Sequence, residues 1–169
     1  MLSAAAFAVG VGACNGSSDE PETPADVLAR GGSIARVTIA TRTYDFEVTC
    51  YDAGAGSVIA VGTGVDVDPV TGITRDTRVF VQAFLGDSYV GVTVASPEAA
   101  AGAPGEEVYE AGLDDSFDLL LEDDVIASDD IQFVRNLDLT QGDGEPAGEG
   151  SLHVTCKKYE QGVPPGLER

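Results

Sequence analysis

Hydrophobic and polar residues alternate along much of the chain after residue 34, with a period of two. The clearest run spans residues 44–50, where Tyr, Phe, Val and Cys share one parity and Asp, Glu and Thr share the other. Residues 152–156 repeat the pattern, with Leu, Val and Cys on one parity and His153 on the other. Such alternation predicts β-strands that bury one face and expose the other.

Further apolar runs predict more strands, and turn residues separate them. The dipeptides Asp68-Pro69, Thr71-Gly72 and Gly86-Asp87 indicate turns, and residues 96–106 are typical of a loop. Short strands at this spacing, without a long helical period, predict an all-β domain over residues 34–156. Its fold is expected to be an antiparallel β-sandwich or a strongly curled sheet. The additional strands are expected at residues 58–61, 79–85, 89–94, 117–121 and 131–139.

The first thirteen residues are typical of an export leader. Residues 2–13 are small and uncharged, and they are too short to span a bilayer as a helix. The run ends in Val11-Gly12-Ala13-Cys14, which resembles a bacterial lipobox, so residues 1–13 are expected to be a signal peptide and Cys14 to be acylated. No Lys or Arg occurs among the first 29 residues, so the true start codon is expected upstream. The alternative is a buried N-terminal strand with an unrelated cysteine.

The two ends of the chain are expected to be poorly ordered. Residues 14–33 are rich in Gly, Ser, Pro, Thr, Asp and Glu, which predicts a flexible spacer. Within it, Thr23 is a candidate N-cap, with Pro24 in the first turn of a short helix. Residues 157–169 are expected to form a disordered C-terminal tail.

The sequence Val-Thr-Cys occurs twice, at residues 48–50 and 154–156. With Cys14 assigned to a lipid, Cys50 and Cys156 remain as an even pair in an oxidising compartment. We therefore predict one disulfide between them, which ties the first part of the domain to its last strand. Two free thiols in an exported protein are the alternative.

Acidic residues dominate the charge, with 29 Asp and Glu against nine Lys and Arg and a formal net charge of −20. Such a chain repels phosphate backbones, so nucleic-acid binding is not expected. The acids concentrate between residues 101 and 150. This region is interpreted as a solvated face that aids solubility, and a surface for cations or a basic partner is the alternative.

Arg135 is the one cation in that acidic region. It shares the apolar parity of Ile131 and Phe133, where an unpaired guanidinium would be costly. We expect it at a rim or end of the sheet, paired to a carboxylate. A register break near Asn136 that exposes Arg135 to solvent is the alternative. The candidate partners are Asp114, Asp115, Asp118 and Glu122.

These stretches together resemble the LpqH lipoprotein-antigen family of mycobacteria and related actinobacteria. The resemblance lies in the lipobox and polar spacer, in residues 46–62 with their Gly-rich turn, and in residues 150–156. It implies a lipid-anchored lipoprotein exposed at the surface of the cell envelope. It also implies stimulation of host receptors through the acylated N-terminus.

The sequence contains no established catalytic motif. Its single histidine, His153, is expected to point outward from a strand. A catalytic triad would need it, and no nucleophile elbow, Walker loop or zinc cluster accompanies it. We expect neither an enzyme nor a cofactor.

Clustered carboxylates offer only a weak candidate for a calcium site. Their spacing does not follow an EF-hand loop, and ordinary surface acids are the alternative. The candidate ligands are Glu122, Asp123, Asp124, Asp129 and Asp130.

Two functions are compatible with the sequence. The first is a non-enzymatic cell-envelope lipoprotein, anchored in the membrane by its N-terminal lipid, that is structural or binds a host or envelope protein. The second is an extracytoplasmic carrier of a small apolar or lipid ligand, which needs an apolar cavity.

Overall fold

The computed structural model describes residues 22–83, 88–95, 105–112, 117–138 and 143–167. The leader, Cys14, the Gly86-Asp87 turn, and Asp114 and Asp115 lie outside these residues. In the described part the chain is mostly β, with 69% of residues in strands, as predicted. Its elements are α1 (Pro24–Ala29), β1 (Ser33–Ile39), β2 (Arg42–Gly54), β3 (Ser57–Val67), β4 (Thr74–Ala83), β5 (Tyr89–Ala95), β6 (Glu106–Ala111), β7 (Leu120–Glu122), β8 (Val125–Asp138), β9 (Asp143–Thr155) and β10 (Tyr159–Gln161).

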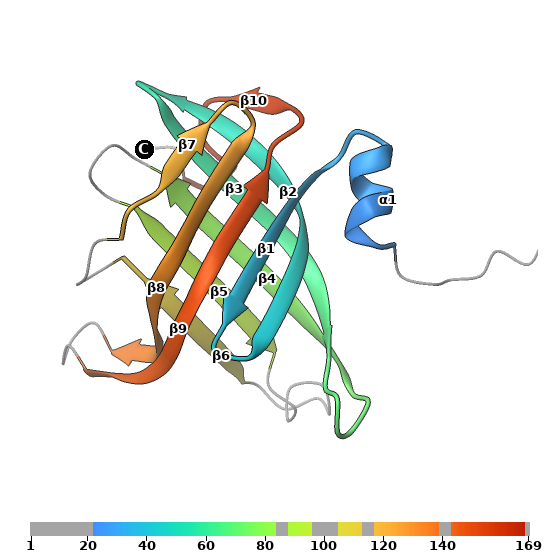
Figure 1. Ribbon diagram of the computed structural model, residues 1–169, viewed down its shortest axis with the longest axis vertical. Helices are drawn as coiled ribbons and strands as arrows, with labels where there is room; N and C mark the ends of the chain where they lie inside the picture. Colours follow the sequence, from blue (N-terminus) through green and yellow to red (C-terminus); the bar gives the residue numbers. More distant parts are fainter. Residues whose placement is uncertain (1–21, 84–87, 96–104, 113–116, 139–142, 168–169) are drawn as a thin grey trace, which may run out of the picture.

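The sheet closes into a barrel of eight antiparallel strands rather than forming a sandwich (Figure 1). Strands β1 to β6 pair in chain order, and β8 and β9 continue the ring. Strand β1 closes it, because Val37 lies opposite Tyr44 of β2 on one edge and opposite Leu152 of β9 on the other. The expectation of a β-sandwich is therefore wrong, and the expected curling goes as far as closure of the ring.

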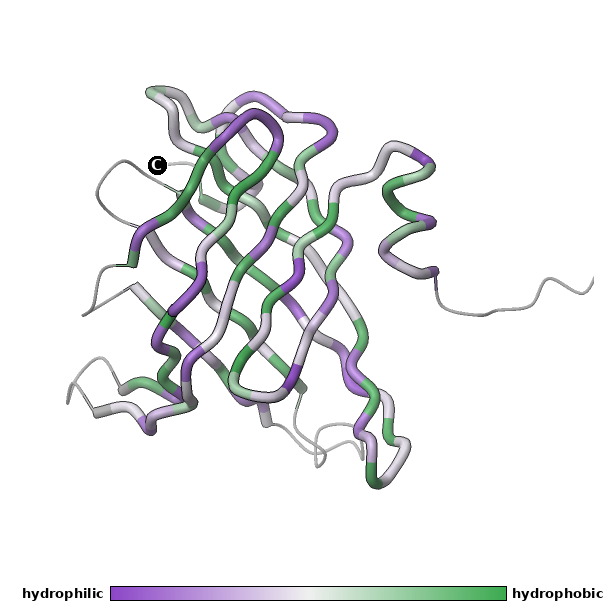
Figure 2. Tube along the Cα trace, viewed as in Figure 1, coloured by the Kyte–Doolittle hydropathy of each residue, from purple (hydrophilic) through white to green (hydrophobic). Residues whose placement is uncertain are grey.

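The alternation seen in the sequence determines which side chains fill the barrel. Along β2 and β9 the predicted apolar parity is buried, and Glu47, Thr49 and His153 face water. Figure 2 shows the alternation as green and purple segments along each strand. Phe46 and Phe133 are the largest side chains in this interior. The fully enclosed part also contains Val37, Val81, Val90, Val92, Val94, Ile126, Ile131, Leu152 and Val154.

Two inward positions contain glycine because neighbouring strands approach closely there. A Cβ atom at Gly62 would lie 2.1 Å from the carbonyl oxygen of Glu47, and one at Gly150 would lie 2.0 Å from that of Thr38. Neither distance is compatible with a side chain unless the backbone moves.

The predicted disulfide between Cys50 and Cys156 is present, with a Cα–Cα distance of 5.9 Å. It lies at the end of the barrel where β1 has not yet begun. Ser33, the first residue of β1, is opposite Val48, so the segment of β2 from Cys50 onward has no β1 residue beside it. The bridge joins β2 to the end of β9 across this gap.

The C-terminal segment occupies the same gap, which corrects the expectation of a disordered tail. Strand β10 runs parallel to β2, with Tyr159 opposite Cys50 and Gln161 opposite Asp52. A strand edge left unpaired by β1 is a template for any nearby extended segment, and the chain just after Cys156 is held there by the disulfide.

The C-terminal part of the expected spacer is also ordered. Thr23 caps α1 in a capping box with Asp26, and Pro24 lies in its first turn, as predicted. Val27 is buried, and Arg30 donates a 2.7 Å hydrogen bond to Glu47 on β2. These contacts dock residues 22–32 beside the barrel (Figure 1), so the flexible spacer predicted over residues 14–33 is wrong for that part.

The contribution of the disulfide to stability can be tested without changing the sequence. Reduction should lower the free energy of unfolding by up to about 5 kcal/mol, because it frees a loop of about a hundred residues in the unfolded chain. Urea unfolding with and without reductant measures this difference. A variant with Cys50→Ala and Cys156→Ala is the control and should not respond to reductant. Equal midpoints for wild type, with thiols shown to be reduced, would contradict the expectation.

Candidate functional site

The interior of the barrel changes from apolar to polar at the end formed by the β1–β2 turn and the β3–β4 hairpin. The inward parity of the strands continues there, but charged and aromatic side chains occupy it. We call this group the polar mouth. It consists of Arg42, Tyr44, Asp66, Arg75, Glu107, Tyr109 and Arg135.

A buried ion pair forms the base of the polar mouth. Asp66 and Arg75 are opposite each other on β3 and β4, and their side chains are 10% and 4% exposed. Arg75 Nε donates to Asp66 Oδ2 at 3.0 Å, and Arg42 Nη2 donates to the same oxygen at 2.6 Å. The second guanidinium offsets part of the cost of desolvating the carboxylate. Glu107 lies 4.0 Å from Arg75 Nη1.

Two tyrosines pack above this ion pair. The Arg42 guanidinium lies 5.5 Å from the ring centre of Tyr44, and the rings of Tyr44 and Tyr109 are 6.4 Å apart. Tyr109 donates to Glu107 at 3.2 Å. Tyr44 is only 3% exposed, and it lines the pocket described below. Burial raises the pKa of Tyr44 to about 12, so its hydroxyl remains a neutral donor.

A pocket of about 250 Å³ opens at the polar mouth. Its only charged lining residues in the described part are Arg42 and Arg135, and Tyr44 and Tyr109 line it as well. The remainder of its wall is small or apolar, formed by Ile39, Ala40, Thr41, Pro146 and Ala147.

Arg135 pairs with a carboxylate at the rim, as expected, but the partner differs from the candidates. Its side chain binds Glu145, the residue opposite it on β9, and is 41% exposed. The register of β8 shifts on both sides of Arg135, and Asn136 has a φ of 51°. Glu145 is the partner because it lies directly opposite Arg135 on β9, a pairing that parity within one strand cannot identify.

Thr77 lies one inward position below the buried ion pair. Its Oγ1 is buried and has no hydrogen bond within the described part of the chain. An unsatisfied buried hydroxyl costs stability.

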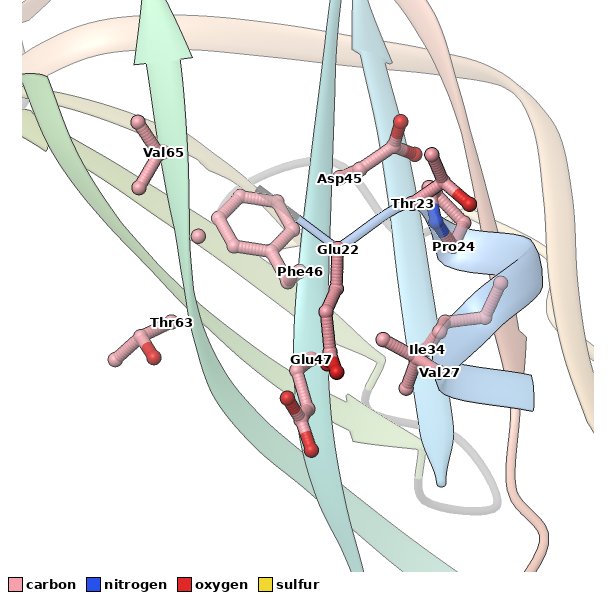
Figure 3. A pocket seen from close by; sticks show the side chains of 11 residues that line it. Glu22, Thr23, Pro24, Val27, Ile34, Asp45, Phe46, Glu47, Thr63 and Val65 are labelled. Atoms are coloured by element: carbon pink, nitrogen blue, oxygen red, sulfur yellow. The ribbon is translucent and has the colours of Figure 1, made fainter. Parts of the chain in front are cut away.

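A second concave feature lies outside the barrel, between α1 and the outer face of β2 and β3 (Figure 3). This groove has a volume of about 540 Å³, and Glu22, Asp45 and Glu47 contribute its acidic groups. Arg30 binds both glutamates, and Arg36 binds Asp45. Since these carboxylates already have cationic partners, the groove is interpreted as the seam where α1 docks.

The residues singled out in the sequence are not brought together into one site. His153 points outward and is exposed, as expected. In the described ranges no group of three or more His, Cys, Asp or Glu could hold a metal ion, so the candidate calcium ligands between Glu122 and Asp130 do not form one. Over the same ranges, no helix has the length and hydrophobicity needed to cross a membrane.

Sequence reasoning missed the polar mouth, although the pattern contained a signal for it. Arg42 continues the inward parity of residues 44–50, and Arg75 continues that of Val79 and Val81. Charged residues on the buried parity of strand ends indicate a polar layer at one end of a closed sheet.

The stability cost of breaking the buried ion pair can be compared with the cost of breaking an exposed ion pair on the same strand, β4. Arg75→Met should destabilise the protein by about 3–5 kcal/mol, because it leaves Asp66 buried with one partner fewer. Arg78→Met is the matched control, since Arg78 faces outward from β4, is 61% exposed and pairs with Glu106. It should cost at most about 1 kcal/mol. Chemical denaturation measures both, and equal costs would contradict the assignment.

Replacing Thr77, unlike replacing Arg75, should not lower the stability of the protein. Thr77→Val keeps the shape of the side chain and removes the unpartnered hydroxyl, so the melting temperature should stay constant or rise. Calorimetry measures it, with Thr93→Val on the half-buried outer parity as the control. A clear loss of stability would show that the hydroxyl has a partner.

Alkaline pH should weaken the fold. The folded-state pKa of Tyr44 is raised to about 12 and those of Tyr89 and Tyr109 are raised too, in each case mainly by burial. Unfolded tyrosines ionise near pH 10, so stability present below pH 10 is lost as the pH rises toward about 12. Urea midpoints across this range measure the loss, and phenolate absorbance reports the ionisation. A flat profile would contradict the burial of these hydroxyls.

The comparisons with known proteins supply no relative from which a function could be transferred. Searches against protein-family models, curated proteins and solved structures gave no match to this chain. The functional argument therefore depends on the sequence and on the geometry described above.

Proposed function

We propose that the chain is a lipid-anchored cell-envelope lipoprotein of the LpqH type, in which the barrel is a non-enzymatic structural or partner-binding module at the cell surface. The observation that supports this best is the buried Cys50–Cys156 disulfide. Structural disulfides form and persist mainly in oxidising compartments outside the cytoplasm. Export to such a compartment is what a leader ending in Cys14 would provide.

The docking of α1 adds support, because it limits the distance between the barrel and an anchor. Only residues 15–21 separate Cys14 from the first described residue. The eight Cα–Cα steps from Cys14 to Glu22 span at most about 29 Å. An acyl group on Cys14 would therefore hold the barrel close to the membrane. The net charge of −20 disfavours adsorption on anionic lipids, so the anchor is the main attachment.

The filled interior favours this function over a lipid carrier. A carrier needs an apolar cavity large enough for its ligand. Here Phe46 and Phe133 belong to one core cluster with Val, Ile and Leu residues, all of them buried. The pockets described above open at the mouth or on the outer surface. Contacts at these surfaces suit a partner-binding or structural module.

The anchor is tested by replacing its proposed attachment point. Cys14→Ala should move the protein from the membrane fraction to the soluble fraction of a bacterial host that processes lipoproteins. The intact mass of the wild-type protein should show a diacylglycerol at residue 14 and the loss of residues 1–13.

The matched control replaces the other two cysteines, Cys50→Ala with Cys156→Ala, which should leave the protein in the membrane fraction. A wild-type protein with a free Cys14 thiol in the soluble fraction would overturn the proposal.

A further inference from the structure

We propose that the pocket at the polar mouth binds a small organic carboxylate, with the carboxylate held by Arg42, Arg135 and the Tyr44 hydroxyl and an apolar body against Ile39 and Pro146. The proposal rests on the partner-binding role proposed above and deepens it by naming a ligand class. The partner-binding role does not require this pocket, so either proposal can fail while the other stands.

The charge of the pocket is unusual for this chain. The protein has nine basic residues against 29 acidic ones, yet the charged groups that line this pocket within the described residues are two arginines. Their ion pairs leave donors available. Arg42 reaches Asp66 through Nη2, and Arg135 reaches Glu145 through Nε and Nη2. In the described part of the chain, Nη1 of neither guanidinium has a hydrogen-bond partner, and such planar groups suit carboxylates.

The Tyr44 hydroxyl is a further donor beside Arg42. Tyr44 is 3% exposed and lines the pocket, and burial keeps its hydroxyl protonated. A ligand oxygen beside Arg42 would accept a hydrogen bond from this hydroxyl.

The size and the wall of the pocket favour an organic acid over an inorganic anion. About 250 Å³ holds roughly eight water molecules, which suits a ligand the size of benzoate. Apolar atoms of Ile39, Ala40, Pro146 and Ala147 gain nothing from a bare phosphate. A net charge of −20 also penalises a dianion more than a monoanion. The carboxylate can belong to a free acid or to the C-terminus of a peptide.

The test is an NMR titration of the full 169-residue chain with four probes. Benzoate should give saturable shifts of the amides of Ala40 and Ala147, with a dissociation constant in the millimolar range. Its neutral counterpart benzamide should give none. Inorganic phosphate binding as well as benzoate would overturn the assignment of the ligand class. An acetylated Ala-Phe dipeptide distinguishes the two sources, because only recognition of a peptide C-terminus makes it bind more tightly than benzoate.

Variants separate a binding role from a structural one. Arg135→Gln and Tyr44→Phe should each weaken benzoate binding by about tenfold, the factor expected for one charge-assisted hydrogen bond. Their melting temperatures should stay near that of wild type, because Arg135 is partly exposed and Tyr44→Phe keeps the ring that packs against Tyr109. Arg78→Gln, an exposed ion-paired arginine on the outer face, is the control and should bind as wild type does.

Absence of saturable shifts at tens of millimolar benzoate would overturn the inference, as would unchanged affinity in both variants. Either result leaves the lipid anchor untouched, because that proposal is judged by where the protein fractionates after replacement of Cys14. Conversely, a soluble protein with a free Cys14 thiol that still binds benzoate would refute the anchor and keep the site.

Discussion

The pairing of β1 on both of its edges is the constraint on which the rest of the structure depends. Residues 34–39 hydrogen-bond with β2 on one side and with β9 on the other, and this joins the two ends of a simple meander into a ring. Without that closure, β2 and β9 would each present a long unpaired edge, and the buried parity of every strand would lose its opposite wall. The disulfide and β10 complete the ring at the end that β1 does not reach.

The sequence predicted strands where the alternation is clear, but it missed β6 and expected a strand at residues 117–121 that begins only at Leu120. Alternation is a local signal, whereas closure of the sheet depends on distant residues. Residues 44–50 and 152–156 show their inward faces within a few positions. Whether β1 also meets β9 depends on a register between residues more than a hundred positions apart. The dependence on distant residues also explains why the strand in the C-terminal segment was not predicted. A short polar segment such as Tyr159–Gln161 becomes a strand only because a vacant edge of β2 lies beside Cys156.

The polar mouth shows where parity arguments succeed and where they stop. Arg135 is at the rim with a carboxylate, as its position on an apolar parity indicates, but the register between β8 and β9 selects Glu145 as the partner. In the sequence, Arg42, Asp66 and Arg75 are charged residues on the buried parity of their strands. Their grouping became visible only once β2, β3 and β4 were known to be neighbours in a closed sheet.

The two ends of the barrel differ in chemistry, because one contains the disulfide and the other contains the polar mouth. Cys50 lies eight residues along β2 from Arg42, a distance of about 26 Å in an extended strand. The disulfide end and the packed Phe and Val layers supply stability, so the other end can accommodate desolvated charges that contribute little to folding. A buried Asp66 shared by two guanidiniums holds Arg42 in place beside the Tyr44 ring, with Arg42 bound to Asp66 through Nη2. Donors held this rigidly lose little entropy on meeting an acceptor, which is why even a small pocket at this position can be selective.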